Sequence, residues 1–127
     1  MPFARISVPR HLSDAQLQQV STAVHRSLVK AFDVPAADLF QVLTRHPAEE
    51  LICSSEYLGI AHTTSVAFIP ITCNEGRTVE MKKTLFSHIA SEIAKGGAIA
   101  AADVLAHLVE VKKENWSFGD GIAQYAI

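Results

Sequence analysis

The segment VPAADL at residues 34–39 returns as IAAADV at residues 99–104, about 65 residues further along the chain. The same offset relates two further pairs of positions: Lys30 with Lys95, and Ser13 with Thr78 at two expected helix starts. Because these matches share one register, we interpret the chain as a duplicated unit, with pseudo-repeats of about residues 2–60 and 65–127.

The first repeat predicts a strand, a helix and a second strand. Residues 3–8 alternate in a strand-like way and are closed by Pro9. Ser13 followed by Gln16 indicates a capped helix start. Apolar residues then recur at helical spacing: Leu17, Val20, Val24, Leu28 and Phe32. The pair Val34-Pro35 ends the helix, because proline disfavours helical backbone in the residue before it. Residues 38–45 then predict the second strand.

The second repeat predicts strands at residues 66–72 and 104–111 around a helix at residues 78–95. That helix should end at Gly96-Gly97. Its expected buried face comprises Leu85, Phe86, Ile89 and Ile93. Residues 47–64 form a long connection with room for a short strand, and residues 116–121 suit a hairpin or an arm laid on a neighbour.

These elements together predict an α+β protein. Two strands joined by a crossover helix in one sheet should be parallel. We therefore expect one domain, residues 1–127, with a four-stranded mixed sheet and two helices on one face. The exposed strand edges and the aromatic tail predict a homotrimer.

Composition excludes several classes of function. With 127 residues, 19% of them charged, and a net charge of −2, the chain has no basic patch for nucleic acid. No apolar run approaches the roughly 18 residues of a membrane span, so we expect a cytoplasmic protein. Cys53 and Cys73 are too far apart for a disulfide framework, and the histidines show no ligand spacing, so neither metal nor cofactor is expected.

The pair Met1-Pro2 predicts a reactive amine. A small second residue allows removal of the initiator methionine, which leaves the prolyl nitrogen as a secondary amine able to act as base, acid or nucleophile. This interpretation requires that Met1 is absent from the working protein. In the alternative, Pro2 is an ordinary proline at the start of a strand, and a blocked amine would leave the chain with another role.

Strand direction predicts which residues accompany Pro2. If the first two strands are parallel, their amino-terminal ends lie at the same edge of the sheet, and so do Pro2 and Asp38. A third strand running the other way would end at that edge and bring Arg77 there. Arg77 precedes a helix, where its charge is unfavourable, which favours anion binding over a merely solvated role. The role of Asp38 is left undecided between catalysis and a structural role in a turn, because the repeat places Asp103 at the equivalent position.

The sequence resembles the tautomerase superfamily, most closely its malonate semialdehyde decarboxylase group. The resemblance rests on Pro2, residues 31–38, Gly76-Arg77-Thr78 with Lys82, and WSFGDG at residues 116–121. It implies trimers of a duplicated β-α-β fold. It also implies a role for each of five residues: Pro2 as catalytic amine, Asp38 as its carboxylate partner, Arg77 as substrate-carboxylate binder, and Trp116 and Phe118 as the apolar pocket wall.

One departure separates the chain from the decarboxylases, which carry Arg-x-Arg where residues 74–77 read NEGR. Losing one guanidinium weakens forked binding of a carboxylate. We therefore expect keto–enol tautomerisation of small oxo acids, with Pro2 neutral at working pH. The alternatives are a decarboxylase or hydratase using protonated Pro2 or an iminium, a catalytically silent trimeric binding protein on the same fold, and a plain structural module.

Overall fold

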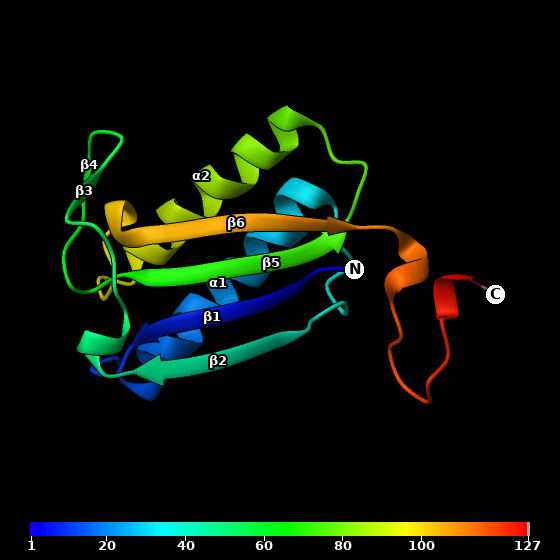
Figure 1. Cartoon of the computed structure of the whole chain (residues 1–127), viewed down its shortest axis with the longest axis horizontal. Helices are drawn as coiled ribbons and strands as arrows, with labels where there is room; N and C mark the ends of the chain where they lie inside the picture. Colours follow the sequence, from blue (N-terminus) through cyan, green and yellow to red (C-terminus); the bar gives the residue numbers. More distant parts are fainter. Residues whose placement is uncertain (127) are drawn as a thin grey trace.

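The computed structural model describes residues 1–126 and shows a four-stranded sheet with two helices on one of its faces (Figure 1). In spatial order the strands are β2 (Gln41–His46), β1 (Phe3–Pro9), β5 (Ala67–Asn74) and β6 (Val104–Val111). The helices are α1 (Asp14–Phe32) and α2 (Val79–Lys95). The predicted α+β architecture is confirmed.

Two β-α-β units meet along the centre of the sheet. Strand β1 is parallel to β2, and β5 is parallel to β6, whereas β1 and β5 are antiparallel. In the central pair Phe3 lies opposite Thr72. The start of β1 therefore lies beside the end of β5, as the predicted strand directions required.

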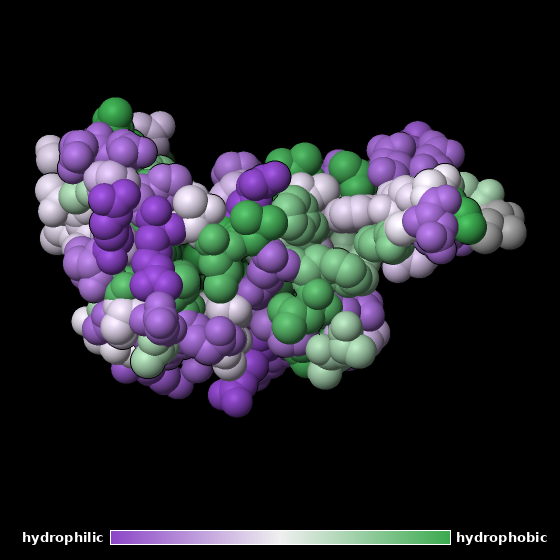
Figure 2. Space-filling view, turned by 90° about the horizontal axis from the view of Figure 1, so that it is seen from below, coloured by the Kyte–Doolittle hydropathy of each residue, from purple (hydrophilic) through white to green (hydrophobic). Residues whose placement is uncertain are grey.

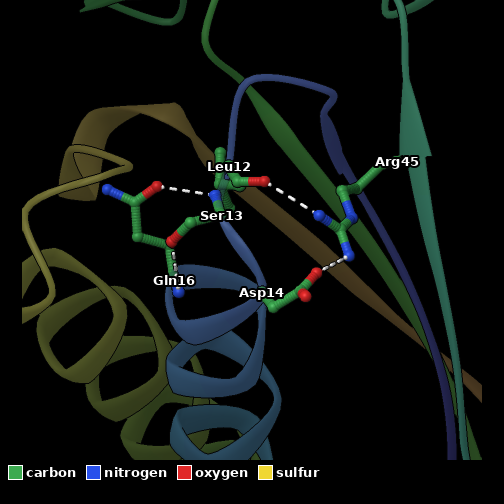
Figure 3. A network of polar contacts seen from close by, with 5 residues as sticks. All are labelled: Leu12, Ser13, Asp14, Gln16 and Arg45. Atoms are coloured by element: carbon green, nitrogen blue, oxygen red, sulfur yellow. Dashed lines mark hydrogen bonds and ion pairs between the residues drawn. The ribbon is translucent and has the colours of Figure 1, made fainter.

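The first turn of α1 is held by a capping box and an arginine from β2 (Figure 3). The Ser13 hydroxyl accepts the Gln16 N–H at 3.1 Å, and the Gln16 side chain accepts the Ser13 N–H at 2.9 Å. The Arg45 guanidinium donates to the Leu12 carbonyl at 3.1 Å and pairs with Asp14 at 2.5 Å. These bonds satisfy helix-end groups and fix the helix against the second strand.

The core lies between the helices and the covered face of the sheet. The α1 stripe was predicted correctly, although Leu17 is only partly buried. On α2 the buried line is Leu85, Ile89 and Ile93. Phe86 was predicted to be buried but is only half-buried. The buried residues recur every four positions. Phe86 comes one position after Leu85, and this step of about 100° around the helix axis turns its side chain toward the flank of the helix.

Two predicted strand ends differ from the structure by two residues or more, and the long connection holds a pair of short strands. Strand β2 begins at Gln41 rather than at residue 38, because the Asp38 N–H donates to the Pro35 carbonyl in a turn. The long connection contains a small hairpin, β3 (Glu56–Tyr57) with β4 (Ile60–Ala61). Strand β5 continues to Asn74, two residues further than predicted.

The C-terminal segment extends beyond the end of the sheet as an arm (Figure 1). It contains the short 3₁₀ helices η3 (Lys113–Asn115) and η4 (Gln124–Ala126), and not the predicted alternative of a hairpin.

The sheet face opposite the helices exposes apolar side chains on its outer strands. Exposed valines occur on both outer strands, with Val42 on β2 at 40% and Val109 on β6 at 46%. Seen from below, from the β2 side, hydrophobic residues gather on the body of the molecule between its two projecting ends (Figure 2). No helix within residues 1–126 combines the length and the apolar character needed to cross a membrane.

Candidate active site

The start of β1, the turn before β2 and the segment after β5 meet at one end of the sheet. Pro2 is buried there, while Asp38 and Arg77 are each half-buried. Both side chains lie close enough to the amino terminus for their charges to act on it. The structure therefore brings together the amine-bearing end of the chain, the carboxylate and the guanidinium that the sequence singled out.

The surroundings of the amino terminus favour a neutral amine. Burial lowers the pKa of the Met1 amine below its ordinary value of 8.0, and the Arg77 guanidinium lowers that pKa further. The Asp38 carboxylate raises the same pKa, and Lys113 lowers it. Burial and like charge disfavour an ammonium, whereas a nearby carboxylate stabilises it.

Arg77 is held in place from two sides. One guanidinium nitrogen donates to the Asn74 carbonyl at 2.9 Å, and the guanidinium carbon lies 4.9 Å from the centre of the buried Phe32 ring. Stacking on an aromatic face orients the planar fork and leaves further N–H donors for an anion. Arg77 is therefore a preorganised cation beside the amine.

The two aspartates related by the duplication have different surroundings. Asp103 is 2% exposed, and its carboxylate accepts the Thr63 N–H at 2.8 Å and the Thr63 hydroxyl at 2.6 Å. Within residues 1–126 the Asp38 carboxylate accepts no such bond, and it acts on the amino terminus through its charge. The second repeat thus uses this aspartate as a structural anchor, whereas the first presents it at the candidate site.

An aromatic wall borders Pro2. The cavity beside it has a volume of about 300 Å³ and is lined by Pro2, Phe3, Phe40, Trp116, Ser117 and Phe118. The Trp116 and Phe118 rings stack with centroids 5.3 Å apart, and the Phe40 ring lies 5.7 Å from Phe118. The cavity lining does not include Asp38 or Arg77, whose charges act instead on the amino terminus next to Pro2.

Sequence reasoning missed Phe40, which belongs to this wall, and the contact that Asn74 makes with the wall residue Trp116. Phe40 comes directly before β2 and is 42% exposed, and a large aromatic two residues after Asp38 was the available signal. Asn74 is 8% exposed, and its side-chain oxygen accepts the Trp116 indole N–H at 2.7 Å. Nothing local in the sequence points to that bond, because the two residues are 42 positions apart.

The remaining candidates for reactive chemistry are few. Burial raises the pKa of the Cys73 thiol, which is buried beside the amino terminus. Among the residues that the structure describes, no group of three or more His, Cys, Asp or Glu side chains could hold a metal ion.

Comparison with known proteins relates the whole chain to one family. Two family models, both described as "Tautomerase enzyme", match residues 38–119 and residues 2–60. The chain is 35% identical to YusQ of Bacillus subtilis (strain 168), described as a probable tautomerase, over 98% of both chains.

Two solved structures share the fold over nearly their full length. One is FG41 malonate semialdehyde decarboxylase inhibited by 3-bromopropiolate, with a TM-score of 0.91 and 35% identity, covering 98% of this chain and 94% of that one. The other is a malonate semialdehyde decarboxylase described with decarboxylase and hydratase activities. It has a TM-score of 0.88 and 27% identity, covering 98% of this chain and 95% of that one.

Proposed function

The chain belongs to the tautomerase family of enzymes, and from the geometry of its site we propose that it catalyses keto–enol tautomerisation of small oxo acids through an amino-terminal Pro2. The main observation behind this proposal is the environment of the amino terminus. The amine there is partly buried, and the charges of Arg77 and Asp38 both act on it. Removal of Met1 would place the secondary amine of Pro2 within this neighbourhood, at the edge of the apolar cavity.

In this mechanism Pro2 carries the proton. The neutral amine takes a proton from the enol oxygen, the carbonyl forms, and the resulting ammonium delivers a proton to the neighbouring carbon. Burial and Arg77, which lower the pKa of the Met1 amine, would likewise favour the neutral Pro2 amine, while Asp38 would stabilise the ammonium that forms during the reaction. The amine ends each cycle in the state in which it began.

The lining of the site defines the substrate class. A cavity of about 300 Å³ walled by Phe40, Trp116 and Phe118 suits a small aryl or alkyl group. Arg77 supplies a forked donor for a carboxylate. We infer a small monoanionic 2-oxo or 3-oxo acid whose carboxylate faces Arg77 and whose apolar part faces the aromatic wall.

Decarboxylation of a 3-oxo acid is the second candidate. The 35% identity with FG41 malonate semialdehyde decarboxylase supports it, whereas the single arginine in residues 74–77 weakens carboxylate placement. In the covalent form of this route, the Pro2 amine condenses with the carbonyl and releases water, and the iminium accepts the electron pair left when carbon dioxide departs. The enamine that remains takes a proton from water on the carbon that lost carbon dioxide, and hydrolysis of the resulting iminium releases the carbonyl product and the free Pro2 amine.

Two measurements on the same preparation test the proposal. Intact mass should show a chain that begins at Pro2, and enol–keto conversion of an aryl 2-oxo acid should require that form. Borohydride added with a 3-oxo acid should leave no adduct if Pro2 only moves protons. A reduced adduct on Pro2 together with release of carbon dioxide would contradict the proposed tautomerase activity and support decarboxylase activity instead.

Arg77→Ala should raise KM for the oxo acid more than it lowers kcat, because the carboxylate loses its forked partner. Arg26→Ala, at an exposed position on α1, is the matched control and should leave both constants unchanged. Equal KM values in the two variants would show that Arg77 does not contribute to substrate binding.

We also propose that the working form is a cytoplasmic homotrimer. Both outer strands, β2 and β6, leave one edge unpaired within residues 1–126, and the uncovered sheet face presents Val42 and Val109. Exposed edges and apolar faces of this kind require partners in a stable soluble protein. Three copies around one axis would cover these surfaces with the same interface repeated.

A further inference from the structure

The side chain of Asn74 lies at the junction of two parts of the site. Asn74 ends β5, and its side-chain oxygen accepts the Trp116 indole N–H at 2.7 Å. Its own carbonyl accepts a guanidinium N–H of Arg77 at 2.9 Å. One residue therefore contacts both the aromatic wall and the cation, from the strand that is paired with β1 beside Pro2.

Because Asn74 is buried, its side-chain oxygen has little competition from water as the acceptor for the Trp116 N–H. At 8% exposure, water cannot readily replace the side-chain oxygen as an acceptor. An indole has a single N–H donor, so this bond decides one orientation of the ring. The oriented ring then stacks on Phe118 at an interplanar angle of 16° and lines the cavity beside Pro2.

The arm that carries Trp116 has few other ties to the sheet end. The preceding η3 turn is exposed, and Ser117 beside Trp116 is exposed as well. The aromatic contacts of Phe118 reach Tyr125 on the same arm and Phe40 before β2. Among residues 1–126, the bond from Asn74 is thus the polar link between the arm and the central strands at this end of the sheet.

We propose that Asn74 is a positioning residue, which holds the Trp116 indole as the wall of the Pro2 pocket and thereby sets the fit of the apolar part of the substrate. This inference rests on the proposed function for its effect on turnover. The contact itself is independent of any activity. Asn74 acts through Trp116, so its loss should change substrate fit and leave the proton transfer at Pro2 intact.

Intrinsic fluorescence tests the contact directly, because Trp116 is the only tryptophan of the chain. Asn74→Leu keeps a similar volume but removes the acceptor. It should change the emission maximum and increase quenching by acrylamide. Asn74→Asp retains an acceptor and should restore the wild-type emission. Asn115→Leu is the matched control, since Asn115 is the only other asparagine, is exposed, and precedes Trp116 directly.

Kinetics on the processed enzyme test the consequence. Asn74→Leu should lower kcat/KM for an aryl oxo acid about tenfold, mostly through KM, as expected when a buried indole N–H loses its partner. The pH at which kcat/KM changes should stay at the wild-type value. Trp116→Phe removes the donor of the same bond and should produce a loss of similar size. The double variant should be no worse than the poorer single variant.

Each outcome decides between the alternatives. Unchanged fluorescence in Asn74→Leu overturns the inference, whatever the rates. Changed fluorescence with wild-type kcat/KM, in an enzyme that Pro2→Ala inactivates, overturns the role in substrate fit. If Pro2→Ala is fully active, the proposed function fails instead, and fluorescence alone decides whether Asn74 positions the indole. If Asn74→Leu does not fold, Trp116→Phe with wild-type kcat/KM overturns the inference equally.

Discussion

Pro2 owes its proposed role to a combination of chemistry and position. Its nitrogen becomes a secondary amine only at a chain end, and the structure buries Pro2 directly before β1, beside an aromatic cavity. Asp38 and Arg77 act on the same end of the chain, where they have opposite effects on the pKa of the Met1 amine. At this scale the site that we propose is one amine, with two charged side chains from different segments that shift its pKa in opposite directions.

Replacing Pro2 tests that amine. Pro2→Ala leaves a primary amine in nearly the same place, so enol–keto turnover should fall by roughly 10²–10⁴-fold, the usual contribution of a general acid or base. Steady-state rates with an aryl 2-oxo acid provide the measurement, and circular dichroism checks the fold. Pro47→Ala, at the opposite end of the sheet, is the control and should keep wild-type activity. Equal rates for wild type and Pro2→Ala would favour the binding protein.

Once Met1 is removed, the Pro2 amine should experience the burial and the Arg77 charge that lower the pKa of the Met1 amine, and the pH dependence of kcat/KM tests this. A base must be unprotonated, so kcat/KM should rise with pH and level off above the pKa, which we expect below the ordinary value of 8.0. Arg77→Ala removes a charge that lowers this pKa, so the inflection should move to higher pH. Asp38→Asn removes a charge that raises it, so the inflection should move to lower pH. Shifts in the same direction would contradict this assignment.

At the scale of elements, the site depends on how strand and helix ends are fixed. The capping box at Ser13 and the Arg45 contacts hold α1 against β2 at the end of the sheet opposite the site (Figure 3). At the site end, Phe32 closes α1 and supplies the ring on which Arg77 stacks. The same helix is thus anchored at one end and contributes to the site at the other.

Removing the cap should destabilise the fold without touching the site. Ser13→Ala is expected to lower the free energy of unfolding by about 1 kcal/mol, because the first turn loses its acceptor. Urea denaturation measures this loss as a lower midpoint at constant slope. Ser87→Ala, at an exposed position within α2, serves as control and should not reduce stability. Unchanged stability in Ser13→Ala would mean that Arg45 alone holds the helix start.

For the whole molecule, the uneven covering of the sheet is the main feature. Both helices occupy one face of the sheet (Figure 1), and the opposite face exposes Val42 on β2 and Val109 on β6. A face of this kind accounts for the trimer that we propose, since burial of apolar area drives association.

Light scattering at micromolar concentration should give three times the mass of one chain. Val109→Lys places a charge on the uncovered face and should shift the mass toward that of one chain. Thr84→Lys, exposed on the helical side, adds the same charge and should preserve the trimer. A wild-type mass equal to one chain would remove the proposed assembly.

Local sequence patterns were enough to predict the two helices and the four strands of the main sheet in their order, because apolar spacing, capping residues and prolines act within a few residues of one another. The duplication also predicted that Pro2, Asp38 and Arg77 would reach the same end of the sheet. Local patterns were less reliable where a turn competed with a strand, so β2 begins three residues later than predicted, at Gln41.

Only the tertiary structure separated residues that look equivalent in the sequence. Asp38 and Asp103 occupy matching positions, yet Thr63 binds one of them and the amino terminus lies near the other. The bond between Asn74 and Trp116 likewise joins segments 42 residues apart. Such surroundings depend on which distant segments pack together, and a side chain's burial and partners are set by that packing.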